Sequence, residues 1–147
     1  MHFFVGVIIP NTKDIKSYVE SLLAPYDENE ESNEETHWDW WEIGGRWDGI
    51  LKDGVRNTDK PYDHYIENNI VKISDFLALE GVDDKLKQSI HKMLNETFQL
   101  PYAIVSDAEG WIEGDGYLEH SKEWEKKAIE ILKRHSGEYL VCVDCHQ

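Results

Sequence analysis

The residues best suited to chemistry lie in the segment 37–51, which reads HWDWWEIGGRWDGIL and holds four tryptophans within ten residues. On an extended strand, alternate residues face opposite sides, so each side would carry both indoles and ionisable groups. A pure core would avoid those charges, and a pure surface would avoid so many indoles. We therefore interpret this segment as the wall of a binding site.

Two glycines and an arginine follow the strand that this segment predicts. Gly44 and Gly45 lack side chains where the chain turns, which allows a ligand or another strand to approach. The guanidinium of Arg46 can stack on indoles and match a carboxylate or phosphate in two parallel hydrogen bonds. The pattern predicts a pocket for a small, flat, anionic, nucleotide-like ligand. Its predicted binding residues are Trp38, Trp40, Trp41, Gly44, Gly45, Arg46 and Trp47.

A structural interpretation of the same residues stays open. Any single indole can serve as core, and Arg46 can form an internal ion pair with Asp39, Glu42 or Asp48.

The last residues, 142–146, read CVDCH, the spacing that attaches c-type haem. Haem attachment requires export, and we find no signal peptide. On a strand, the two cysteines would also face opposite sides. A structural zinc ion usually needs four ligands, and the chain has no second C-x-x-C. We therefore predict no cofactor and no metal ion.

Strand alternation favours a different role for this terminus. Asp144 and His146 share a face, so the carboxylate could orient the imidazole for acid–base chemistry. Metal binding with help from His37 or Asp39, and a frayed terminus facing solvent, are the alternatives. If the first and last strands pair, His2 would lie near His146.

The remaining pattern predicts one α+β domain over residues 1–147. Apolar runs at 3–9 and 138–145 predict interior strands, and the helical periodicity after Thr12 and after Ser121 predicts helices. Gly44 and Gly45 are predicted to separate two short strands, and residues 102–113 to form a hairpin. The sheet would be mixed or antiparallel with helices packed on it, and the element order is compatible with a ferredoxin-like sheet carrying a large central insertion.

Charge excludes several classes of partner. The chain has 30 acidic and 15 basic residues and a net charge of −15, which disfavours direct nucleic-acid binding and docking on anionic membranes. Segment 27–35, DENEESNEE, is predicted to be a solvated loop that could meet a basic protein partner. No run of about 20 apolar residues is present, and we expect a cytoplasmic protein.

The string WDWWEIGGRWDG at 38–49, with VDCH at 143–146, resembles a motif pair of small uncharacterised proteins of bacteria and their phages. The similarity covers less than a quarter of the chain. It implies that Arg46, Asp144 and His146 belong to one site, and a phage setting would favour a counter-defence role by analogy.

The leading hypothesis from the sequence is thus a protein that binds a small ligand in the tryptophan–arginine pocket. One alternative is a hydrolase or lyase in which His146, oriented by Asp144, exchanges protons while Arg46 stabilises negative charge. Another is an acidic inhibitor or nucleic-acid mimic. Exposed aromatics would also suit a homodimer interface.

Overall fold

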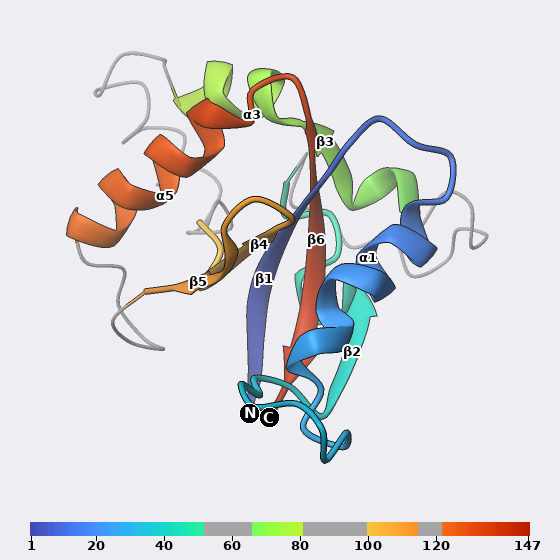
Figure 1. Cartoon of the computed structure of the whole chain (residues 1–147). Coiled ribbons are helices and arrows are strands. Elements are labelled where there is room, and N and C mark those ends of the chain that lie inside the picture. The colour runs from blue at the N-terminus through green and yellow to red at the C-terminus, as the bar shows by residue number, and fades with distance from the viewer. Residues whose placement is uncertain (52–65, 81–99, 115–121) are drawn as a thin grey trace.

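The computed structural model describes residues 1–51, 66–80, 100–114 and 122–147 (Figure 1). Its strands are β1 (His2–Ile9), β2 (Trp40–Ile43), β3 (Ile70–Lys72), β4 (Ala103–Ser106), β5 (Gly110–Glu113) and β6 (Tyr139–His146). Its helices are α1 (Ile15–Leu23), α3 (Ile73–Glu80) and α5 (Lys122–Arg134), with 3-10 turns η1 (Ala24–Tyr26) and η2 (Gly45–Trp47). The six strands form one mixed sheet with helices packed on it, which confirms the predicted α+β class. No helix within these ranges is long and apolar enough to cross a membrane.

The first and last strands form the centre of the sheet. β1 and β6 pair antiparallel along their whole length, from His2 opposite His146 to Ile9 opposite Tyr139. Both strands are almost entirely buried, as their apolar runs predict. The two chain ends consequently lie side by side at one end of the sheet (Figure 1).

The outer strands complete the order β2-β6-β1-β4-β5. β2 pairs with the C-terminal half of β6, and β3 pairs with the N-terminal half of the same edge. On the other side, β4 lies parallel to β1 and forms the predicted hairpin with β5.

This order departs from the ferredoxin-like arrangement, in which a third strand separates the parallel pair of a split βαβ unit. Here the parallel strands β1 and β4 are direct neighbours. Burial explains the difference, because all four residues of β4 are buried whereas β5 is only partly covered. The more apolar hairpin strand therefore takes the inner position.

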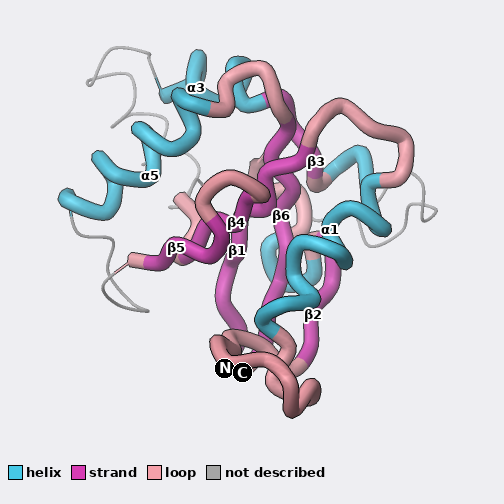
Figure 2. The backbone as a smooth tube through the Cα atoms, in the orientation of Figure 1, coloured by secondary structure: helices cyan, strands magenta, loops and turns pink. Residues whose placement is uncertain are grey.

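Helices lie on both sides of the sheet (Figure 2), and side-chain alternation along β1 and β6 divides the core into two layers. On one face, Val5 and Val7 pack with Val19 and Leu23 of α1. On the other face, Phe4 and Ile8 pack with residues of α3 and α5, including Phe76, Trp124, Ala128 and Leu132. The sheet is thus covered by helices on both sides.

The prediction of a second short strand after the glycine pair is wrong. Gly44 and Gly45 adopt positive φ angles of 79° and 53°, which turn the chain sharply. The backbone amide of Trp47 then donates to the carbonyl of Gly44 at 3.0 Å, so the chain coils into η2 instead of extending. The sequence also predicts a long surface excursion over 52–69 and a helix that begins at Asp83 or Asp84. Residues 52–65 of the excursion, that helix and the Ser121 cap lie outside the described residues.

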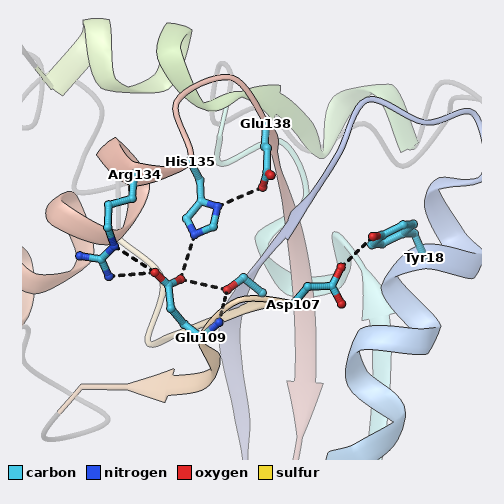
Figure 3. A network of polar contacts seen from close by, with 7 residues as sticks. Tyr18, Asp107, Glu109, Arg134, His135 and Glu138 are labelled. Carbon is cyan, nitrogen blue, oxygen red and sulfur yellow. Dashed lines mark hydrogen bonds and ion pairs between the residues drawn. The ribbon is translucent and has the colours of Figure 1, made fainter.

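A polar network surrounds the β4–β5 turn (Figure 3), at the end of the sheet opposite the chain termini (Figure 1). Glu109, in the β4–β5 turn, accepts hydrogen bonds from Arg134 at 2.9 Å and 3.0 Å and lies 2.9 Å from Nε2 of His135. The other ring nitrogen of His135 lies 3.1 Å from Glu138. On the opposite helical layer, the hydroxyl of Tyr18 donates to Asp107 of the same turn at 2.7 Å. The turn is therefore tied to both helical layers.

The Glu109 carboxylate should make this network sensitive to pH. Burial alone would raise the pKa of Glu109, but hydrogen bonds from Arg134, His135 and Ser106 outweigh burial and lower that pKa below its usual value. A lowered folded-state pKa adds stability above the unfolded pKa of about 4.3, and this stability is lost as the pH falls through the folded-state pKa.

We expect Glu109→Gln to lower the free energy of unfolding by about 2 kcal/mol at pH 7. The difference from the wild type should shrink below about pH 4, as urea denaturation at both pH values would measure. Glu130→Gln, on the exposed side of α5, makes the same charge change and should have little effect. A pH-independent difference would contradict this assignment.

The two thiols of β6 should be chemically inert in the native protein. Cys142 and Cys145 are unpaired and completely buried, on opposite faces of the sheet. Burial, followed by the nearby Asp144 carboxylate, raises the pKa of both thiols above the ordinary value. We expect negligible labelling by iodoacetamide at pH 8 until urea unfolds the protein, measured by mass spectrometry; rapid native labelling would show that β6 opens locally.

Candidate functional site

The pairing of the terminal strands places two histidines next to each other. His2 of β1 and His146 of β6 are direct partners in the antiparallel register. Their ring centroids are 4.9 Å apart and their planes are inclined by 69°. Direct cross-strand neighbours share a face, so both imidazoles are presented on the same side of the sheet.

Each imidazole is hydrogen-bonded to its own carboxylate through Nδ1. Nδ1 of His2 lies 2.9 Å from Oδ1 of Asp144, and Nδ1 of His146 lies 2.7 Å from Oδ1 of Asp39. Because an ionised carboxylate can only accept, it holds the proton on Nδ1 and fixes the orientation of the ring. Within the described residues neither Nε2 atom has a hydrogen-bond partner, so these two atoms remain for a ligand.

Asp144 is a buried carboxylate held by the backbone of the glycine turn. Its side chain is 2% exposed, and its Oδ2 accepts a hydrogen bond of 3.0 Å from the backbone amide of Arg46. Gly45 packs so closely that an added Cβ would lie 2.5 Å from both Cβ and Oδ2 of Asp144. The side chain of Asp144 therefore occupies the space that the missing side chain of Gly45 leaves open.

Asp39 is more open and is positioned by the acidic loop. Its side chain is 33% exposed, and its backbone amide donates to the carbonyl of His146 at 2.8 Å. The side-chain amide of Asn29 donates to the carbonyl of Asp39 at 3.0 Å and to Oδ1 of Asp27 at 2.9 Å. The loop 27–35, mostly exposed as predicted, thereby contributes Asn29 to the site.

These groups line a shallow, open depression of about 470 Å³. The lining residues are His2, Asn29, Asp39, Trp40 and His146. The Trp40 side chain is 45% exposed and lies edge-on to His2, with ring centroids 5.9 Å apart. A large exposed indole beside two imidazoles offers a stacking surface next to proton-transfer groups.

The structure does not bring the four predicted indoles to one place. Trp38 and Trp41 pack in the core layer of α1, and the Trp38 nitrogen donates to the carbonyl of Leu23. Trp47 packs on the opposite layer, where it stacks on Phe4 at 6.3 Å. Trp40 alone among these four lines the depression. The indoles divide because the chain is extended only at 40–43 and turns at the glycines.

Arg46 lies beside the site through its backbone. The residue is exposed, and its amide rather than its guanidinium makes the contact with Asp144. Gly44 continues the edge pairing of β2, since its amide donates to the carbonyl of Cys142 at 2.9 Å. Arg46 thus contacts Asp144 through its backbone amide, and Asp144 and His146 lie on the same strand, β6.

The predicted catalytic residues lie at the site, but their partners differ from the expectation. Asp144 contacts His2 instead of orienting His146, whose carboxylate partner is Asp39. Residues two apart on a strand are separated by nearly 7 Å, whereas residues on neighbouring strands lie closer. The expected proximity of His2 and His146 is confirmed by the strand register.

Sequence reasoning did not assign Asn29 to the site, and no local signal marks it within an acidic loop.

Metal binding finds no support in the described residues, because within them no three or more His, Cys, Asp or Glu side chains cluster in a way that could hold an ion. His37, considered as a ligand, instead stacks on Trp111 at 4.4 Å and contacts Glu35.

Comparison of the chain with protein-family models, with curated proteins and with solved structures finds no match. The resemblance of segments 38–49 and 143–146 to bacterial and phage proteins stays a prediction. The site is therefore interpreted from its own geometry.

Gly45 provides a test of how Asp144 is held. Gly45→Ala should lower the free energy of unfolding by about 2 kcal/mol, because the methyl group meets Asp144 and φ is +53°. The imidazole NMR signals of His2 should shift as Asp144 is displaced. Gly137→Ala is the matched control, since an added Cβ there meets nothing within 4 Å. Unchanged His2 signals in Gly45→Ala would show that the turn does not position the carboxylate.

Proposed function

We propose that the protein is an acid–base catalyst of the hydrolase or lyase type that acts on a small, flat, anionic, nucleotide-like molecule. The observation that carries this proposal is the pair of imidazoles 4.9 Å apart, each bonded to its own carboxylate through Nδ1 and each with Nε2 left for a ligand.

Two adjacent imidazoles can divide the proton transfers of one reaction. One neutral ring accepts a proton from the attacking or eliminated group, while the other, protonated, donates a proton to the leaving group. Each aspartate stabilises the imidazolium that forms beside it and keeps the ring in one orientation. Neither Cys142 nor Cys145 can serve as a nucleophile from its buried position, so proton transfer is the chemistry that this site favours.

Three features of the site support the ligand class. The exposed indole of Trp40 offers a flat ring a stacking partner, and base–indole stacking tolerates many rings. An imidazolium Nε2–H can donate to a phosphate or carboxylate oxygen. The net charge of −15 opposes polyanions, so a ligand with one anionic group is favoured over a nucleic acid.

The binding function predicted from the tryptophan–arginine pocket has less support, because Trp38, Trp41 and Trp47 are packed in the two core layers. Trp40 is exposed, so it can still provide the ring stacking that this prediction includes. The acidic-partner alternative is supported by the net charge of −15 and by the exposure of loop 27–35.

Substitution of the two histidines tests the proposal. Hydrolysis would be measured from pH 4 to 9 on p-nitrophenyl phosphate, bis(p-nitrophenyl) phosphate, p-nitrophenyl acetate and cyclic nucleoside monophosphates. We expect a bell-shaped pH profile, and a loss of kcat of about 10²- to 10⁴-fold in either His2→Gln or His146→Gln. The double variant should lose little more, since the rings act together.

The controls separate catalysis from folding. Thermal unfolding of each variant establishes that the fold persists, and Asp39→Asn should reduce kcat while leaving affinity nearly unchanged. Turnover that is equal in the wild type and the double variant on every substrate, including no turnover at all, would overturn the proposal.

A further inference from the structure

The two loop residues that line the depression, Asn29 and Asp39, each have a side-chain oxygen without a hydrogen-bond partner among the described residues. The Asn29 side-chain nitrogen points at two acceptors, Oδ1 of Asp27 and the carbonyl of Asp39, and this fixes which end of the amide is nitrogen. The oxygen, Oδ1, is therefore the free end of that amide. Within the described ranges it has no hydrogen-bond partner, and Asn29 lines the depression.

The second loop residue has the same character. Oδ1 of Asp39 contacts His146, and Oδ2 has no hydrogen-bond partner among the described residues. Both loop residues and both histidines line the depression together with Trp40. A ligand seated against Trp40 would therefore have acceptor oxygens from the loop and Nε2 atoms from the strands as possible partners. A group that can only accept hydrogen bonds would leave the loop oxygens unpaired.

We propose that the flat part of the ligand is a heteroaromatic ring with an exocyclic amino group, stacked on Trp40 and donating to Oδ1 of Asn29. This inference rests on the proposed function, which places a flat ligand in the same depression. Amino-substituted rings of the adenine or cytosine type meet the requirement, whereas rings with a carbonyl at the same position present an acceptor to an acceptor.

Asn29 would then determine specificity, while the two histidines perform the chemistry. The depression is open to water, so the discrimination is that of a solvated hydrogen bond, about tenfold in affinity. In this proposal the acidic loop positions Asn29, because Oδ1 of Asp27 accepts hydrogen bonds from both the backbone and the side-chain nitrogen of Asn29.

Binding of matched nucleotides tests this inference directly. Isothermal titration calorimetry would compare adenosine monophosphate with inosine monophosphate and cytidine monophosphate with uridine monophosphate. These pairs differ in whether an amino group or a carbonyl occupies one ring position. We expect the amino member of each pair to bind about tenfold more tightly. Asn29→Ala should remove this preference.

Two further variants control the interpretation. Asn33→Ala removes hydrogen bonds to the carbonyls of Ala24 and Asp27 in the same loop but does not touch the depression, so the preference should persist. Trp40→Ala should weaken all four nucleotides alike, whereas Trp40→Phe should keep most of the affinity.

The outcomes separate this inference from the proposed function. Equal affinity for amino and carbonyl members, with histidine-dependent turnover intact, would overturn the amino-ring inference alone. A preference that survives Asn29→Ala would also overturn it, because Oδ1 of Asn29 would not be the acceptor. If no nucleotide binds while ester turnover depends on His2 and His146, the ligand class is wrong but acid–base catalysis stands.

Discussion

β1 and β6 pair antiparallel over their full length, and both the core and the candidate site are built on this pairing. It places His2 against His146 and provides the buried centre from which both core layers are built. It also gives β6 a second edge, on which β2 and β3 pair in succession. A one-residue slip in this register would move every side chain to the opposite face, so the burial of both strands and the geometry of the site are specified together.

The buried carboxylate of Asp144 connects the two motifs that stand out in the sequence. Taking a carboxylate out of water is costly unless donors replace the lost hydration. Here the ring of His2 and the backbone amide of Arg46 supply those contacts, and the absence of a side chain at Gly45 creates the room. The glycine–glycine–arginine turn and the terminal strand are thus one packed unit, although about 100 residues separate them along the chain.

The two ends of the sheet use similar residue types for different purposes. At the β4–β5 turn, both ring nitrogens of His135 face carboxylates and its side chain is 12% exposed, so the ring is fully engaged in holding the fold. At the end near the chain termini, His2 and His146 each use one nitrogen for a carboxylate and border an open depression. That unused nitrogen, more than the residue type, marks a histidine available for chemistry.

Local periodicity and backbone sterics are enough to predict the interior strands, the amphipathic helices, the turn at the glycine pair and the shared face of Asp144 and His146. Three features became visible only in the folded chain: Asp144 pairs with His2, Asp39 pairs with His146, and Asn29 reaches the site. The fold also separates the four indoles of segment 37–51. Only residues 40–43 form a strand, so the alternation of side chains between two faces does not continue into the turns on either side. These outcomes depend on which segments become neighbours in space, and hydrogen-bond partners across strands leave no periodic trace along a single chain.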